Sequence, residues 1–126
     1  MRLAIGDRYL NYKKLIVWQL AKSLALDTYR ITKTFPEKER FGLISQMTRA
    51  AVSVPSNIAE GTSRRSAKDQ IRFIEIAYGS LMELSCQIEI SHELGYLDQE
   101  AFEEINAKIE NLAVRLSNYR KAKNNC

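Results

Sequence analysis

Residues 102–119 read FEEINAKIENLAVRLSNY, and in this stretch apolar side chains recur at alternating intervals of three and four positions. This spacing places one apolar stripe along an α-helix. We therefore predict an amphipathic helix that buries a single face. The stripe consists of Phe102, Ile105, Ile109, Leu112, Leu116 and Tyr119.

The same spacing occurs in three earlier segments, so we expect four helices in all. Short turns separate these segments, and short turns between long helices make consecutive helices antiparallel. The first helix is predicted over residues 12–34, with a stripe of Val17, Ala21, Leu24, Thr28, Ile31 and Phe35. The stripe of the second is Ile44, Met47, Ala51, Val54 and Ile58. That of the third is Ile74, Ala77, Leu81, Leu84 and Ile88.

Proline, glycine and serine mark the predicted helix ends. Pro36 ends the first helix, because proline disfavours helix at the residue before it. Gly61 is expected to end the second helix in a left-handed C-cap, and Ser66 to cap the third together with Asp69. Pro55 lies inside the second helix, so this helix either bends or is replaced by two shorter ones.

Length and composition agree with one all-α domain. The chain has 126 residues, enough to bury a continuous core, and only five Gly and two Pro. We predict an up-down-up-down antiparallel four-helix bundle over residues 12–123, with a kink at Pro55. Residues 1–11 are an N-terminal extension and residues 124–126 a C-terminal tail.

Charge and cysteine content indicate a cytoplasmic protein without disulfides. The formal net charge of +4 and the pI near 9.1 suggest nucleic acid or an acidic surface as a partner. We find no signal-peptide core at the N-terminus and no apolar stretch of transmembrane length. Cys86, inside a helical pattern, is expected to be a small buried side chain, and Cys126 a thiol in the tail.

The sequence contains few motifs for catalysis or metal binding, so we predict that the protein is not an enzyme and has no cofactor and no metal site. Glu89 and His92 have the Glu-x-x-His spacing of di-iron bundles, but the motif occurs once and His92 is the single histidine. Ser–His or Cys–His catalysis would depend on the same side chain. We expect His92 to lie at a helix end, where the helix dipole favours a cation.

A polar stripe follows one face of the second predicted helix. Its amides, hydroxyls and single opposed charges differ from the Lys and Glu that dominate solvated faces. This composition favours hydrogen bonds at a helix or subunit contact over a plain solvated face. On the third helix, Glu83 and Gln87 are expected to supply partners for the stripe. The stripe consists of Gln46, Arg49, Ser53, Asn57 and Glu60.

Several of these residues also form a pattern that resembles a known family. The longest run is SVPSNIAEG at residues 53–61, accompanied by AYGS at 77–80 and LGYL at 94–97. Over nearly the whole chain, the sequence is similar to the four-helix bundle proteins of the 23S rRNA intervening-sequence family. Further matching positions are Trp18, Phe35, Pro36, Glu39, Gln46, Arg49, Arg64, Glu83 and Leu84.

The resemblance implies a left-handed four-helix bundle that assembles as a ring-like homopentamer and has no settled biochemical activity. Relatives of that family include the accessory protein of diversity-generating retroelements, a basic pentameric bundle that works with a reverse transcriptase and nucleic acid. By this analogy, the expected partners are further copies of the chain, RNA or DNA, and a reverse transcriptase or ribosome-associated protein. No membrane partner is expected.

Topology places most basic residues at one end of such a bundle. The start of the first helix, the connection between the second and third helices and the end of the fourth share this end. Arg2, Arg8 and Arg115 map there, and the opposite end leans acidic. In a ring, each copy would contribute such a basic end, so weak phosphate contacts would act together. Contacts of this kind distinguish little between bases. The residues expected to bind nucleic acid are Lys13, Lys14, Arg64, Arg65, Lys68, Arg72, Arg120, Lys121 and Lys123.

A protein-interaction scaffold is the alternative to nucleic-acid binding. In that case the basic residues would only keep the protein soluble, and Trp18, Tyr29 and Tyr78 would be candidates for partner contacts. Steep salt dependence of nucleic-acid binding would separate the two hypotheses, because phosphate contacts release counterions.

Overall fold

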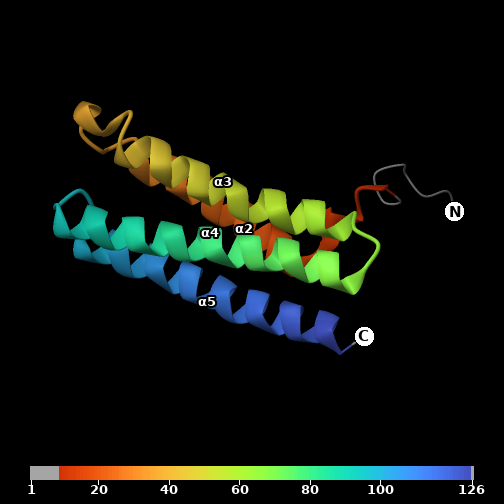
Figure 1. Ribbon diagram of the computed structural model, residues 1–126. Coiled ribbons are helices and arrows are strands. Elements are labelled where there is room, and N and C mark those ends of the chain that lie inside the picture. Colours follow the sequence, from red (N-terminus) through yellow and green to blue (C-terminus); the bar gives the residue numbers. More distant parts are fainter. Residues whose placement is uncertain (1–8, 126) are drawn as a thin grey trace, which may run out of the picture.

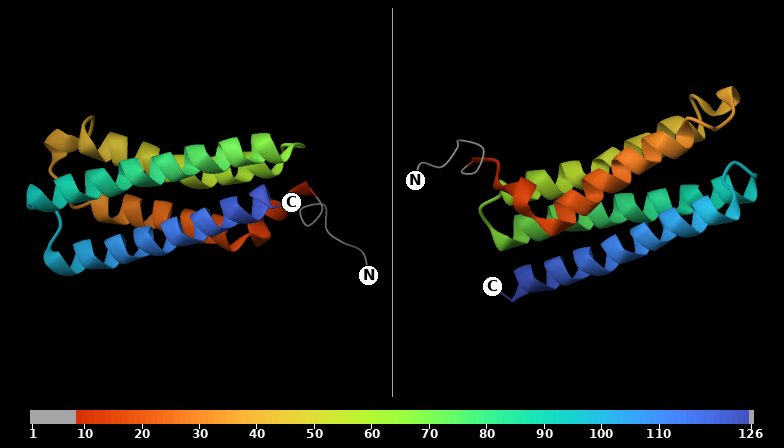
Figure 2. Two further views of the ribbon diagram at one scale, coloured as in Figure 1. Left: turned by 60° about the horizontal axis from the view of Figure 1, so that its bottom comes forward. Right: turned by 180° about the vertical axis from the view of Figure 1, so that it is seen from behind.

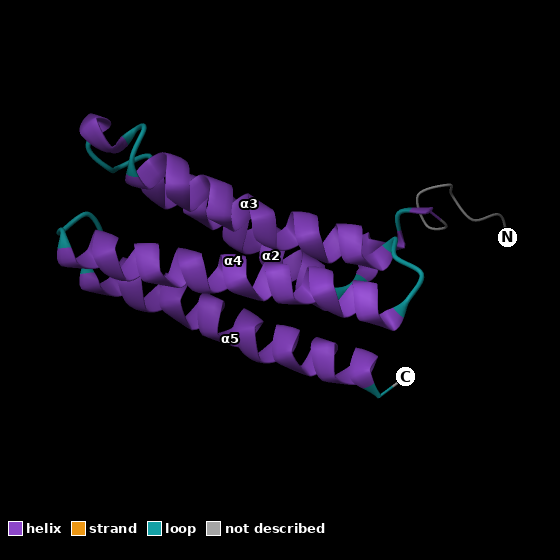
Figure 3. Ribbon diagram, in the orientation of Figure 1, coloured by secondary structure: helices purple, strands orange, loops and turns teal. Residues whose placement is uncertain are grey.

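Every regular element in residues 9–125, the part of the chain described by the computed structural model, is a helix (Figure 3). The all-α fold expected from the sequence is therefore confirmed. In chain order the elements are the 3-10 helix η1 (Asn11–Lys14), α2 (Ile16–Thr32), the 3-10 helix η2 (Glu37–Glu39), α3 (Leu43–Thr62), α4 (Ala67–Glu93) and α5 (Gln99–Asn124). Arg2, Arg8 and Cys126, in the predicted extension and tail, lie outside the described residues.

The four long helices lie side by side in one bundle (Figure 1). Figures 1 and 2 show the beginning of α2, the α3–α4 connection and the end of α5 at one end of the molecule. The α2–α3 and α4–α5 connections lie at the other end. α4 packs most extensively on α3, whereas α2 and α5 touch over a smaller part of their length. The handedness of the bundle stays a prediction.

Buried apolar side chains from all four long helices form one core. The stripes read from the spacing are the faces that the structure buries, and Leu81, Leu84 and Ile88 have no exposed surface. Burial of each such side chain stabilises the fold by about 1.5–3 kcal/mol. Four stripe positions are only partly buried at the edge of this core: Ile31, Ile44, Phe102 and Tyr119.

The first long helix begins later than predicted. The chain forms η1 first, and Leu15 then adopts an extended backbone with φ −72° and ψ 128°, which separates η1 from α2. The Gln19 side chain donates to the Lys13 carbonyl oxygen at 2.8 Å and ties η1 to α2. After α2 ends, Phe35 packs back into the core and Pro36 follows it.

Pro55 and Gly61 both lie inside α3, which is a single helix. The alternative of two shorter helices is therefore wrong, whereas a bend at Pro55 stays a prediction. The predicted C-cap at Gly61 is also wrong, because the helix continues to Thr62 and Gly61 is buried. A Cβ at Gly61 would lie 3.1 Å from the Cβ of Phe73 on α4. The missing side chain thus permits the close approach of α3 and α4.

Both ends of α4 follow the signals in the sequence. At its start, the Ser66 hydroxyl oxygen accepts a hydrogen bond from the Asp69 backbone N–H at 3.1 Å. At its end, Gly95 has φ 82°, in the left-handed region that glycine adopts at little cost. The Tyr96 backbone N–H donates to the Ser91 carbonyl oxygen at 2.9 Å. The chain therefore reverses into α5 within a few residues.

Candidate nucleic-acid interface and polar face

One end of the bundle gathers the basic residues that the sequence predicts to bind nucleic acid. They come from η1, the α3–α4 connection, the first turns of α4 and the last turns of α5, which lie together in Figures 1 and 2. The acidic side chains beside them are Glu60, Asp69 and Glu75. We call this end the basic pole and define it as Lys13, Lys14, Arg64, Arg65, Lys68, Arg72, Arg115, Arg120, Lys121 and Lys123.

Two arginines of the basic pole are held on the ring of Phe73. The guanidinium carbons of Arg64 and Arg72 lie 4.6 Å and 4.8 Å from the ring centroid. Arg64 also donates to a Glu60 carboxylate oxygen at 2.8 Å, and the Gln70 amide donates to the Arg64 carbonyl oxygen at 2.8 Å. These contacts fix Arg64 and offset part of its charge, so it is less available to a phosphate than its sequence position suggests.

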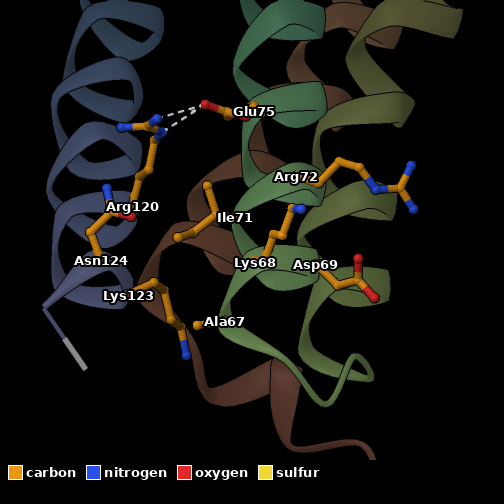
Figure 4. Close-up of a pocket in the computed structure, with 9 residues that line it drawn as sticks. All are labelled: Ala67, Lys68, Asp69, Ile71, Arg72, Glu75, Arg120, Lys123 and Asn124. Carbon is orange, nitrogen blue, oxygen red and sulfur yellow. Dashed lines mark hydrogen bonds and ion pairs between the residues drawn. The ribbon is translucent and has the colours of Figure 1, made fainter.

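Arg120 is paired across the groove between α4 and α5. Its Nε and Nη2 donate to the same Glu75 oxygen at 3.0 Å and 2.7 Å (Figure 4). An exposed ion pair of this kind contributes only about 0–1 kcal/mol, so a phosphate can replace the carboxylate at small cost. Glu75 and Phe73 were missed in the sequence, because contacts between distant helices leave no local spacing signal.

Arg65, Lys68 and Lys121 are exposed and make no ion pair within residues 9–125. Arg65 lies in the α3–α4 connection, Lys68 in the first turn of α4 and Lys121 in the last turn of α5. Lys68 also stands beside the first backbone N–H groups of α4, which lack partners within the helix. These three cations are therefore available to a phosphate chain.

Glu39 organises the opposite end of the bundle. Its carboxylate accepts hydrogen bonds from the Leu43 backbone N–H at 3.2 Å and from the Tyr96 hydroxyl at 2.9 Å. The Leu43 N–H and, second, the Tyr96 hydroxyl lower the pKa of Glu39, and the bond to Glu39 raises the pKa of Tyr96. This end also carries exposed Glu37, Asp98, Glu100, Glu103 and Glu104.

The polar stripe of α3 lies at the edge of its contact with α4. The Ser53 and Ser80 hydroxyl oxygens are 2.8 Å apart, and one hydroxyl donates to the other. The Asn57 amide donates to the Ser53 carbonyl oxygen at 2.8 Å and to its hydroxyl oxygen at 3.0 Å. The inner part of the stripe is therefore committed to the α3–α4 contact. The outer members remain exposed: Gln46, Arg49 and Glu60.

Within residues 9–125, Glu83 and Gln87 do not supply the hydrogen-bond partners that the sequence predicts for the stripe. Ser80 takes that role, because it lies directly across from Ser53. Glu83 is exposed, and its side chain makes no hydrogen bond within the described chain. Gln87 is only 5% exposed, yet its Oε1 has no hydrogen-bond partner there. Burying an amide oxygen without a partner costs about 1–3 kcal/mol.

Gly79, next to Ser80, is a second residue, after Gln87, whose presence the packing of the described chain does not explain. It is exposed in the interior of α4, and a Cβ there would have no atom within 4 Å. Glycine in a helix interior costs about 1 kcal/mol relative to alanine, and no packing within residues 9–125 requires it. We define the α3–α4 polar face as Gln46, Arg49, Ser53, Asn57, Glu60, Gly79, Ser80, Glu83 and Gln87.

Comparison with known proteins relates this architecture to a family. Residues 13–118 match the family described as 23S rRNA-intervening sequence protein. The chain belongs to this family. The match includes residues of all four long helices and of both surfaces described above, and it confirms the family to which the sequence was likened.

A solved structure shows the same fold as this family member. It is a crystal structure of a protein of unknown function from the S23 ribosomal protein family of Bacteroides thetaiotaomicron VPI-5482. The TM-score is 0.79 at 23% sequence identity, over 84% of this chain and 99% of that chain. Neither this description nor that of the family names an enzymatic activity. A search of curated proteins found no match.

The aromatic residues considered for a scaffold role are dispersed in this family member. Trp18 packs edge-on against Tyr12, with ring centroids 5.0 Å apart, and the Lys22 amine lies 5.2 Å from its ring. Tyr29, also on α2, is 50% exposed. Tyr78 instead lines a cavity between α4 and α5. The three side chains therefore do not form one contact patch.

Cys86 is exposed, so the prediction of a buried thiol is wrong. It falls on the outer face of α4, whereas Leu84 and Ile88 on either side of it face the core. His92 lies in the last turn of α4, as expected, and stacks on Phe102 with ring centroids 4.1 Å apart. Residues 9–125 contain no group of three or more potential metal ligands. No helix in that range has the length and hydropathy needed to cross a membrane.

Proposed function

We propose that this protein is a non-enzymatic, oligomeric accessory protein that binds the backbone of RNA or DNA through its basic pole. The observation that carries the proposal is the collection of basic side chains from four separate segments at one end of the bundle, where they outnumber acidic ones. A surface with this charge attracts a polyphosphate chain and guides its approach.

The side chains of the basic pole differ in what they offer to a phosphate. Arg65, Lys68 and Lys121 are unpaired and exposed, and they would contact phosphate oxygens directly. Arg64 and Arg72 would present fixed guanidinium groups from the ring of Phe73. Contacts of this kind set position and affinity and carry no base information, so we expect binding that depends weakly on sequence.

Self-association through the α3–α4 polar face would strengthen such binding. A second copy packed on this face would meet the space above Gly79 and the exposed charges of Arg49 and Glu83, which make no ion pair within residues 9–125. A ring of five copies, as the family likeness suggests, would repeat the basic pole around an axis and let weak phosphate contacts act together. A reverse transcriptase or a ribosome-associated protein is the additional partner proposed by the same likeness.

Fluorescence anisotropy with a structured RNA and a matched DNA duplex, measured across a salt series, tests nucleic-acid binding. We expect affinity to fall steeply with salt and the Arg65→Glu/Lys121→Glu variant to bind weakly. Its log–log salt slope should be smaller by about two for each copy that contacts the nucleic acid, because each lost phosphate contact removes about one.

The matched control is Lys33→Glu/Lys38→Glu, which makes the same change of charge with exposed residues at the opposite end. This control should keep most of the affinity of the native protein. An equal loss in both variants would show that net charge alone attracts the nucleic acid. No binding at low salt would overturn the proposal in favour of a protein-interaction scaffold.

A further inference from the structure

A cavity of about 530 Å³ opens in the basic pole between the start of α4 and the end of α5 (Figure 4). Its volume falls within the roughly 300–1,000 Å³ that is common for small-molecule sites. Ile71 gives it an apolar wall, and the ion pair of Glu75 with Arg120 stands at its inner end (Figure 4). The cavity is thus bounded by two helices and by a salt bridge.

Two lysines from different helices line this cavity, and neither makes an ion pair in the described chain. Lys68 comes from the first turn of α4, and Lys123 from the last turn of α5. Figure 4 shows the Lys123 side chain directed past Ala67 at the start of α4, and its amine lies 5.3 Å from the centroid of the Tyr119 ring. The Lys68 amine is directed away from α5. Both amines end flexible four-carbon stems, which can turn toward an anion in the cavity.

Arg120 adds a third donor at the inner end. Glu75 engages its Nε and Nη2 through one oxygen, which leaves Nη1 without a hydrogen bond in the described chain. The pair is partly exposed, with 41% of the Arg120 side chain and 52% of the Glu75 side chain accessible. Figure 4 shows this nitrogen turned away from α4, so an anion that enters as far as the pair would bind Arg120 by replacing the Glu75 carboxylate, at small cost.

We propose that this cavity binds a terminal phosphate, the phosphomonoester at the end of a nucleic-acid strand or on a free nucleotide. A phosphomonoester carries close to two negative charges at neutral pH, which match the charges of Lys68 and Lys123, and three oxygens that accept from several directions. An internal phosphodiester carries one charge and needs room for the chain on both sides. A chain that continued past the inner end would meet the Glu75 carboxylate, which repels phosphates.

Where the terminal phosphate belongs to a nucleic-acid strand, the inference rests on the proposed nucleic-acid function of the basic pole. With the end phosphate between Lys68 and Lys123, the remainder of the strand would leave at the same end of the bundle. There it would meet Arg65 and Lys121, which lie outside the cavity. The cavity would thus select strand ends, while the surrounding pole supplies affinity for the backbone.

Anisotropy with one single-stranded RNA in three forms tests the proposal: phosphorylated at the 5′ end, phosphorylated at the 3′ end, and phosphorylated at neither end. We expect at least one phosphorylated form to bind about tenfold more tightly than the unphosphorylated one, a difference typical of a charge-assisted site. Adenosine monophosphate, added as a competitor, should abolish this preference and leave the weaker binding in place.

The Ala67→Trp variant should fill the cavity without changing the charge. Ala67 is exposed in the first turn of α4, so the fold should tolerate the change, and circular dichroism would verify the helix content. We expect the variant to lose the preference for phosphorylated ends and to bind the unphosphorylated RNA as before. Ala107→Trp, at an exposed alanine of α5 outside the cavity, should leave both unchanged. Lys68→Ala/Lys123→Ala should lose the preference as Ala67→Trp does.

The outcomes separate this inference from the proposed function. Equal affinity for all three RNAs, with salt dependence retained, would overturn the terminal-phosphate site and leave backbone binding standing. No RNA binding, together with adenosine monophosphate binding that Ala67→Trp abolishes, would support the site for a free nucleotide and overturn the nucleic-acid function. A preference for phosphorylated ends that persists in Ala67→Trp would place the recognition elsewhere and overturn the inference.

Discussion

Glu39 accepts hydrogen bonds from the Leu43 N–H and the Tyr96 hydroxyl, and these bonds hold its pKa below the ordinary value of 4.5. A carboxylate whose pKa is lower in the folded chain contributes stability that is complete above about pH 4.5 and is lost as the pH falls through the folded value. Glu39→Gln should therefore lower the thermal midpoint at pH 7 more than at pH 3. Circular dichroism melts between these values measure the difference.

Glu37→Gln is the control for this prediction. Glu37 is exposed in η2, and its only ion pair within residues 9–125 is with Arg40 at 3.6 Å, so its loss should change the midpoint little. Tyr96→Phe, which removes one of the two donors, should reproduce part of the effect of Glu39→Gln. Equal shifts at pH 7 and pH 3 in Glu39→Gln would show that the carboxylate charge is not what stabilises this end.

Within the helices, Gly61 and Gly79 should respond to alanine with opposite signs. Gly79→Ala adds a methyl group where no atom lies within 4 Å, so the gain in helix propensity should stabilise the fold by about 1 kcal/mol. Gly61→Ala brings a Cβ to 3.1 Å from that of Phe73, and the forced separation of α3 and α4 should cost about 1–3 kcal/mol. Urea unfolding of both variants gives the two free energies. Stabilisation by Gly61→Ala would show that the α3–α4 contact can shift freely.

The helices could be predicted from the sequence because their signals are local. The stripe through Leu81 and Leu84 needs only one buried face, and Ser66 caps a helix through a residue three positions away. The C-cap prediction for Gly61 is wrong because the role of this glycine depends on the neighbouring helix α4. The position of the basic pole could be predicted from the topology, but which of its side chains form ion pairs could not. Arg120 meets Glu75 across 45 positions, a pairing for which the sequence has no periodic signal.

In the molecule as a whole, the charge differs between the two ends of the bundle, whereas the α3–α4 polar face lies on its side. The basic pole lies at one end of the bundle, with Glu39 and further carboxylates at the other. The α3–α4 polar face instead runs along the side of the bundle. Copies joined through this side face would keep their basic poles at a common end if their axes were roughly parallel. Assembly would then leave the nucleic-acid surface open.

Arg49 and Glu83 provide the test of that assembly. Both are exposed on the α3–α4 polar face and make no ion pair within the described residues, so in a ring they would meet opposite charges of the neighbouring copies. Glu83→Arg and Arg49→Glu should each lower the molar mass measured by light scattering at micromolar concentration. The double variant should recover it, because the exchanged charges match again.

Glu110→Arg, at an exposed position of α5, is the control and should leave the molar mass unchanged. A native protein that is monomeric at these concentrations would contradict self-association, and a double variant that fails to recover would exclude pairing between the two residues. The single variants also predict a functional consequence. Assembly multiplies phosphate contacts without altering the basic pole of each copy. A dissociated variant should therefore bind RNA more weakly and with a smaller salt slope. It should still prefer RNA with a phosphorylated end.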